Sequence, residues 1–162
     1  MRVIVIGGGP AGMMAAISSA ENGNQVTILE KMNSLGRKLL ISGKRRCNIT
    51  SSIPMEEFIS NIPGNGRFLY SSFQNYTNED IINLLRKQNV EVKEERGNRI
   101  FPVSDHSQDV LNALIKKLNS LKVQIRTNAK VKEILLEEVD GVKRAIGDIL
   151  ENEEKIKADK IS

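Results

Sequence analysis

Three glycines at fixed spacing follow the first apolar run of this chain, and they restrict its fold more than any other feature. Arg2–Ile6 is short and β-branched, which is typical of a buried strand. Gly7, Gly9 and Gly12 come directly after it, and residues 13–22 then carry apolar side chains at helical spacing. A G-x-G-x-x-G turn between a strand and a helix predicts a dinucleotide-binding βαβ unit.

The bare glycine pattern is a weak signal, but three later positions extend it. Ala16 stands four residues after Gly12, and Gly23 stands seven residues after Ala16. Glu30 ends a second apolar run over residues 25–30, near the place where a ribose-binding acid is expected. The longer pattern favours a true nucleotide site over the alternative, a glycine-rich turn without a ligand.

Each position of the pattern has a physical role. Gly7 permits the tight turn, Gly9 allows the backbone to approach a pyrophosphate, and Gly12 and Ala16 allow close packing of helix on strand. The start of the helix offers free N–H groups and a positive dipole to phosphates. The carboxylate of Glu30 accepts hydrogen bonds from ribose hydroxyls and repels a 2′-phosphate, which disfavours NADP.

Composition excludes several other classes of protein. The chain has 162 residues and a net charge of +4, and its basic residues form no stripe with interleaved aromatics, so we expect no nucleic-acid partner. A single cysteine, Cys47, excludes an internal disulfide and favours the cytoplasm. The short apolar runs predict neither a signal peptide nor a membrane span.

The rest of the chain mixes helices and strands. Residues 31–53 are read as loop and short helix, and residues 58–73 carry mixed signals. Thr77 and the acids after it predict a helix to about Asn89, with Ile81, Leu84, Leu85 and Gln88 on one face. Ser107 is expected to cap a helix whose apolar positions end at Leu118.

Several strands are also predicted. Two strands, 90–95 and 99–103, are joined by the turn 96–98, and a further strand covers 122–126. Asp140-Gly141 between strand-like runs predicts a hairpin over 129–149. The charged tail from 151 begins a new alternating run. These elements predict an α/β fold: a three-layer Rossmann-like FAD/NAD(P)-binding domain with a small antiparallel β section, over residues 1–162 as a single domain.

The glycines alone do not separate FAD from NAD, but the following stretch helps. Residues 36–50, GRKLLISGKRRCNIT, resemble the signature of the HI0933-like flavoproteins, also called the BaiN or aminoacetone-oxidase-like FAD-dependent family. Residues 66–71, GRFLYS, and 95–104, ERGNRIFPVS, resemble two more of its motifs. The resemblance extends over the whole chain, and the motifs taken together are specific.

The resemblance implies a flavoprotein with two dinucleotide-binding domains and FAD bound non-covalently. It places several residues along the pyrophosphate and flavin, and the backbone of Val131 at the adenine. Together with the glycine pattern, the predicted cofactor-binding set is Gly7, Gly9, Pro10, Ala11, Gly12, Glu30, Lys31, Arg37, Lys38, Ser42, Gly43, Arg46, Cys47, Asn48 and Val131. The family usually has glycine where this chain has Arg45, which puts the backbone path there in question.

Family members are considerably longer than this chain. The last residues resemble the approach to the strand that leads into the family's Ala-Thr-Gly-Gly motif, and that motif is absent here. We therefore expect a truncated, N-terminal portion of the family architecture. Missing strands would leave an open sheet edge, through which the chain would associate with another copy.

Other reactive side chains have simpler explanations. Arg46 fits either an anion site or a solvated loop, whereas Lys44 and Arg45 are expected in solvent. Cys47 fits packing against the cofactor better than a redox role, because no second cysteine exists. His106 is better explained as an exposed residue before a helix than as a base. We predict no metal site and name no catalytic residue.

The sequence thus favours the FAD-binding portion of an FAD-dependent oxidoreductase, in which the flavin transfers hydride or electrons. Its partners would be FAD and either NAD(P)H or a small-molecule substrate. Two alternatives stay open: a non-catalytic nucleotide-binding module or remnant that needs a partner chain, and the NAD-binding domain of a dehydrogenase.

Overall fold

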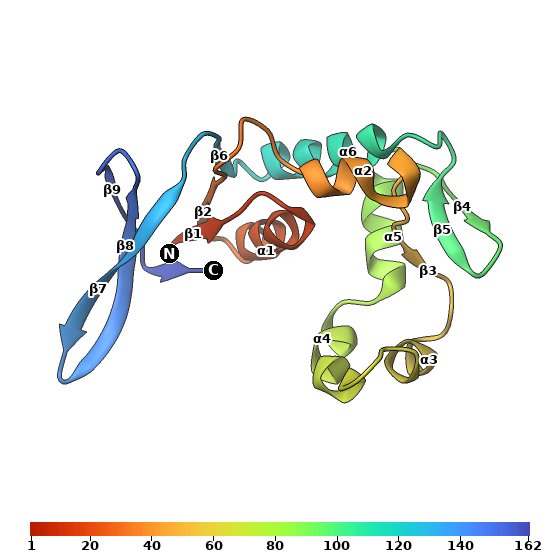
Figure 1. Cartoon of the computed structure of the whole chain (residues 1–162), viewed down its shortest axis with the longest axis horizontal. Coiled ribbons are helices and arrows are strands. Elements are labelled where there is room, and N and C mark those ends of the chain that lie inside the picture. Colours follow the sequence, from red (N-terminus) through yellow and green to blue (C-terminus); the bar gives the residue numbers. More distant parts are fainter. The chain divides into compact units, whose positions relative to one another are not determined.

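The computed structural model describes all 162 residues apart from the side chain of Val139. The chain divides into two compact units (Figure 1): unit 1 comprises Met1–Leu39 and Leu114–Ser162, and unit 2 comprises Leu40–Ala113. Each unit is described by itself. That residues 1–162 act as one domain stays a prediction.

A parallel sheet forms the centre of unit 1. Its strands are β1 (Arg2–Ile6), β2 (Gln25–Leu29), β6 (Gln124–Arg126) and β10 (Lys160–Ile161), in the order β10-β1-β2-β6. All neighbouring pairs are parallel, with Val3 opposite Val26 and Ile28 opposite Ile125. The carboxyl ends of β1 and β2 therefore meet at one edge, where the glycine turn and Glu30 begin.

Helix α1 (Pro10–Glu21) covers one face of this sheet. Of the residues predicted to share a face, Met13, Ala16, Ile17 and Ala20, it buries the first three. The helix stops at Asn22 because Gly23 adopts a φ of 77°, a left-handed conformation that favours glycine. The strand–helix–strand prediction for the first thirty residues is confirmed.

A three-stranded antiparallel sheet packs on the other face. It contains β7 (Val131–Val139), β8 (Val142–Leu150) and β9 (Lys155–Lys157), in that order. Asp140 and Gly141 have φ values of 53° and 75°, as the predicted tight hairpin turn requires. A buried cluster joins the two sheets through Ile4, Leu29, Ala129, Leu150 and Ala158. The helix, the parallel sheet and this sheet form the predicted three layers.

Unit 2 holds short helices around a second antiparallel sheet, with strand order β3-β5-β4. The strands are β3 (Thr50–Ser51), β4 (Val92–Glu95) and β5 (Arg99–Pro102). The helices are α3 (Met55–Ser60), the 3₁₀ turn η1 (Gly66–Leu69), α4 (Tyr70–Asn75) and α5 (Asn78–Lys87). Two further helices, α2 (Arg37–Arg45) and α6 (Ser107–Ser120), extend across the division between the units.

Three details differ from the sequence predictions. Helix α5 begins with the expected cap, a reciprocal pair between Thr77 and Asp80, but it buries Ile82 together with Leu85. Ser107 is the first residue of α6, and its hydroxyl donates 2.9 Å to the carbonyl of Leu40. The short helices α3 and α4 overlap residues 58–73, whose mixed signals predicted no element.

Candidate functional site

The turn between β1 and α1 is shaped by its outer glycines. Gly7 has a φ of 102° and donates its N–H to the carbonyl of Leu29 at 2.8 Å, which fixes the turn against β2. A Cβ on Gly12 would lie 1.9 Å from the carbonyl oxygen of Gly7, so only glycine permits this approach. These two positions therefore have the roles that the glycine pattern predicts.

Helix α1 starts without a side-chain cap. Gly9 is the N-cap residue in extended conformation, no side chain of the described residues caps it, and Pro10 occupies the first turn. The N–H groups of a first helical turn have no partner inside the helix, and the dipole there is positive. Ala11 is exposed in this turn. A Cβ on Gly9 would meet nothing within 4 Å, so space is open beside the N-terminus.

Glu30 lies directly beside this turn, at the end of β2. One carboxylate oxygen accepts the N–H of Gly8 at 2.7 Å, and the other accepts the N–H of Met32 at 2.8 Å. Each carboxylate oxygen has a second acceptor position, so the group retains capacity for a ligand's hydroxyls. The two backbone donors thus hold the carboxylate in one orientation next to the start of α1.

A pocket of about 250 Å³ joins these groups. The loop after β2 closes one side, because Gly36 donates its N–H to the carbonyl of Gly8 at 2.9 Å. Five predicted site residues line the pocket: Gly9, Pro10, Glu30, Arg37 and Lys38. Four lining residues were not predicted: Gly8, Met32, Ser34 and Gly36. The three consecutive glycines 7–9 were a signal for Gly8; nothing in the sequence distinguished Ser34.

Two other predicted residues of unit 1 lie near the end of β2. Lys31 follows Glu30 and is exposed. Val131 begins β7 and packs half-buried against the cluster that joins the two sheets. The segment leading to it runs beside the end of β2, because Ala129 donates its N–H to the carbonyl of Glu30 at 2.9 Å. Contact of Val131 with an adenine stays a prediction.

The remaining predicted residues, Ser42, Gly43, Arg46, Cys47 and Asn48, lie in unit 2, on a sharply folded segment. Helix α2 is interrupted there, because Gly43 and Lys44 have φ values of 55° and 58°. A Cβ on Gly43 would lie 2.6 Å from the backbone nitrogen of Asn48, so the segment closes tightly on itself. Arg45 has a φ of 69°, a left-handed conformation that favours glycine, the residue that the family resemblance leads us to expect there.

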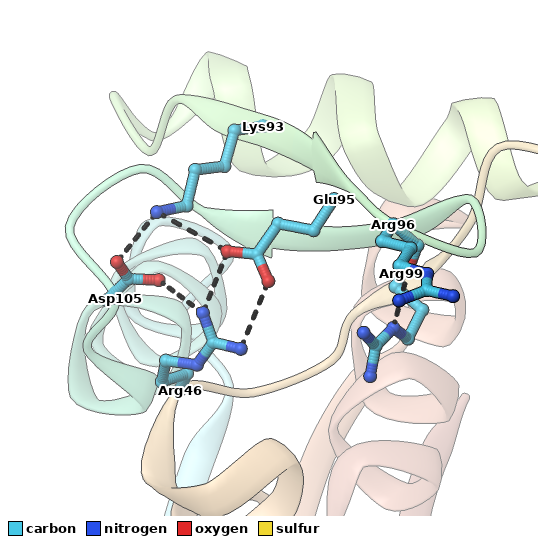
Figure 2. A network of polar contacts seen from close by, with 6 residues as sticks. All are labelled: Arg46, Lys93, Glu95, Arg96, Arg99 and Asp105. Atoms are coloured by element: carbon cyan, nitrogen blue, oxygen red, sulfur yellow. Dashed lines mark hydrogen bonds and ion pairs between the residues drawn. The ribbon is translucent and has the colours of Figure 1, made fainter.

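Arg46 lies at the centre of a polar cluster (Figure 2). Its guanidinium donates to both oxygens of Glu95 at 2.8 and 3.1 Å and to Asp105 at 3.2 Å. It also stacks 4.2 Å from the ring centroid of Phe101. Lys93 completes the cluster with Asp105 at 2.6 Å and Glu95 at 3.6 Å. Arg46 therefore occupies an ion-pair network, an environment that neither of its predicted explanations included.

Electrostatics in the cluster follow from these contacts. The hydrogen bond from Arg46, above all, holds the pKa of Glu95 below its usual value. The hydrogen bond from Lys93 does the same for the pKa of Asp105. The carboxylates in turn raise the pKa values of Arg46 and Lys93. All four groups are charged at neutral pH, and the two positive charges match the two negative ones.

The other candidate reactive residues, Cys47 and His106, have no environment that favours a catalytic role. Cys47 is buried, and burial raises the pKa of its thiol, which disfavours a reactive thiolate. His106 is exposed just before α6. Within the part of the chain that the structure describes, no group of three His, Cys, Asp or Glu could hold a metal ion. No helix among the described residues is long and apolar enough to cross a membrane.

Known proteins are similar to this chain in sequence and in fold. A 3-dehydro-bile acid delta(4,6)-reductase of Clostridium scindens is 31% identical over 149 residues, 90% of this chain and 36% of that protein. A ribosomal RNA dihydrouridine synthase of Haemophilus influenzae is 28% identical over 132 residues, 81% of this chain and 32% of that protein. The chain thus spans about a third of the length of either relative.

The solved structures agree on the fold. The crystal structure of Thermovibrio ammonificans THI4 superposes with a TM-score of 0.71 at 16% identity, over 99% of this chain and 54% of that chain. The sequence model of the HI0933-like protein Rossmann domain matches residues 1–161. The resemblance drawn from the motifs is therefore confirmed, and this chain belongs to the HI0933-like family and carries its Rossmann domain.

Proposed function

We propose that this chain is the FAD-binding part of a flavin-dependent oxidoreductase. One observation carries the proposal: the uncapped N-terminus of α1 and the oriented carboxylate of Glu30 line the same pocket. The first group suits a pyrophosphate and the second suits ribose hydroxyls. Membership of the family favours FAD over NAD as the dinucleotide.

The residues present fit the ADP half of FAD. Open space at Gly9 leaves room for phosphates next to the backbone. Arg37 and Lys38 add two positive charges to the pocket lining, which suits the two negative charges of a pyrophosphate. Glu30 orients the ribose, and the backbone of Val131 is proposed to meet the adenine. These residues bind and orient the cofactor; none is assigned a step in catalysis.

When bound, the flavin supplies hydride transfer between a donor such as NAD(P)H and a substrate. The names of both curated relatives describe reduced carbon–carbon bonds: one is a delta(4,6)-reductase, and the other makes dihydrouridine, the reduced form of uridine. We therefore propose a substrate with a carbon–carbon double bond conjugated to a carbonyl, reduced by the whole protein of which this domain is the cofactor-binding part.

The test is retention of FAD by the purified chain. Protein incubated with FAD is desalted, and the visible flavin absorption that stays with it is compared with that of Gly9→Ala. The new methyl group projects into open space, so we expect unchanged folding by circular dichroism but weakened FAD retention. Glu30→Gln is expected to weaken retention as well, whereas its matched control Glu91→Gln, at an exposed position, is not.

The second candidate is a non-catalytic nucleotide-binding module, because the pocket at the start of α1 and the carboxylate of Glu30 suit a nucleotide whether or not a reaction follows. Folded protein that retains no flavin would overturn autonomous FAD binding and leave this module as the better explanation. Retention of NADH instead of FAD, measured in the same desalting experiment, would overturn the choice of cofactor.

A further inference from the structure

A second cavity in unit 1 lies at the other end of the parallel strands from the glycine turn. Its volume is about 590 Å³, larger than that of the pocket beside α1. Its walls are formed where β1, β2 and β6 begin, together with Ile156 and Lys157 of β9. The proposed FAD pocket starts where β1 and β2 end, and five residues of strand span roughly 15 Å. The two cavities are therefore separate sites.

The sheet face inside this cavity is polar. Leu29 belongs to the buried cluster that joins the two sheets, and side chains alternate along a strand, so Gln25 and Thr27 share its face. Gln124 lies opposite Thr27 on β6, and its side-chain oxygen accepts the Thr27 hydroxyl at 3.4 Å. Parallel sheets that are covered by protein on both faces usually carry apolar residues on both. This part of the face therefore suits a polar ligand better than an apolar protein surface.

The charged side chains of the cavity wall all have the same sign. Arg2, Lys122 and Lys157 line it, and no Asp or Glu is among the described residues of the wall. Asp159, outside the wall, offsets the charge of Arg2 at 3.5 Å. Lys122 and Lys157 make no ion pair with any residue that the structure describes. Two uncompensated ammonium groups therefore favour a ligand with about two negative charges.

We propose that this cavity binds a small phosphate ester, independently of FAD. A phosphate ester carries close to two negative charges at neutral pH and three acceptor oxygens, whereas a carboxylate carries one charge. Lysine ammonium groups bind phosphate as point charges, which suits Lys122 and Lys157. The side-chain amides of Gln25 and Gln124 offer donors and acceptors to the rest of the molecule. The volume of the cavity also lies within the range of small-ligand sites.

An NMR titration of the isotope-labelled full chain tests the proposal, because it locates the ligand. The probes are ADP, glucose 6-phosphate and inorganic phosphate. We expect the two esters to shift the backbone amide signals of residues 24–27, 122–124 and 156–157, and to bind more tightly than inorganic phosphate. Shifts confined to residues 7–12 would place the probe in the proposed FAD pocket and overturn the second site. The result does not depend on whether the chain retains FAD.

Two lysine variants on β9 separate a built site from general attraction of anions. Lys155 and Lys157 are both exposed on this strand, and only Lys157 lines the cavity. Lys157→Gln should raise the Kd of the esters about three- to fivefold, and added salt should weaken binding to the native chain. The matched control Lys155→Gln should leave the Kd within about twofold. Equal effects of the two variants, inorganic phosphate binding as tightly as the esters, or no shifts with any probe would each overturn the proposal.

Discussion

Two regions of the molecule differ in whether their hydrogen-bond donors are already paired: the turn between β1 and α1, and the cluster around Arg46. At the turn, the first N–H groups of α1 are uncapped beside a pocket, and Gly9 leaves open space. At the cluster, the guanidinium is held by two carboxylates and an aromatic ring. The first region offers donors to a ligand, whereas the second has used its donors within the protein.

The difference shows which kind of hydrogen-bond donor stays available to a ligand after folding. Backbone N–H groups at a helix start have no partner within the helix, so they stay available unless a side chain caps them. A guanidinium lies at the end of a long side chain, so it pairs with any carboxylate that the fold brings within reach. Both regions were predicted to bind the cofactor, but only the turn has donors that the structure leaves available for it.

The largest expected effect is that of Gly12→Ala at the turn. The added Cβ would lie 1.9 Å from the backbone oxygen of Gly7, so the helix must move away from the strand. We expect a loss of about 1–3 kcal/mol in the free energy of unfolding, as for other overpacked sites. Urea denaturation measures it, with Gly9→Ala as the control that should unfold like the native chain. Equal stability of the two variants would contradict the close approach.

Sequence reasoning succeeded where the determinants are local. The turn at Gly7–Gly12 and the hairpin at Asp140-Gly141 depend on backbone conformations that few residues adopt, so a few neighbouring letters predict them. The cap at Thr77 is local too, but which face of α5 is buried depends on tertiary packing, and Ile82 was missed. Arg46 meets Glu95 and Asp105 across 49 and 59 residues of chain, a separation that no local pattern reveals.

Asp148 differs from both regions, because its carboxylate is unpaired and also buried away from solvent. It is fully buried on β8, and neither carboxylate oxygen has a hydrogen-bond partner among the described residues. Burial raises the pKa of this carboxyl above its usual 3.8. The folded chain therefore holds a proton that the unfolded chain releases as the pH rises past that value.

The stability contribution of Asp148 is complete below pH 3.8, falls as the pH rises towards the raised folded pKa, and is constant above it. Asp148→Asn lacks this titration, so the variant gains stability relative to the native chain over that window. The gain is about 1.4 kcal/mol for each unit by which the pKa is raised. Denaturation curves at several pH values measure it, and parallel pH profiles would contradict a buried, unpaired carboxyl.

Arg46→Gln tests whether the cluster binds a ligand or only supports the fold. Because two carboxylates already hold the guanidinium, we expect a lower thermal midpoint and an FAD affinity that changes less than in Gly9→Ala. The carboxylates of Glu95 and Asp105, left without Arg46, repel each other near Lys93. An unchanged midpoint with weakened FAD binding would instead favour the direct cofactor contact that the family resemblance implies.

Glu95→Gln should have the smallest effect, with a pH dependence opposite to that of Asp148. The contact with Arg46 lowers the pKa of Glu95 below 4.5, so its contribution to stability is present above that pH and is lost as the pH falls through the folded value. The glutamine variant should therefore differ from the native chain at neutral pH and converge with it in acid. Salt screens part of the attraction in this half-buried pair, so thermal midpoints at low and high ionic strength separate a charge effect from a packing effect. A difference that persists in acid and in high salt would show that Glu95 stabilises the chain through packing and not through its charge.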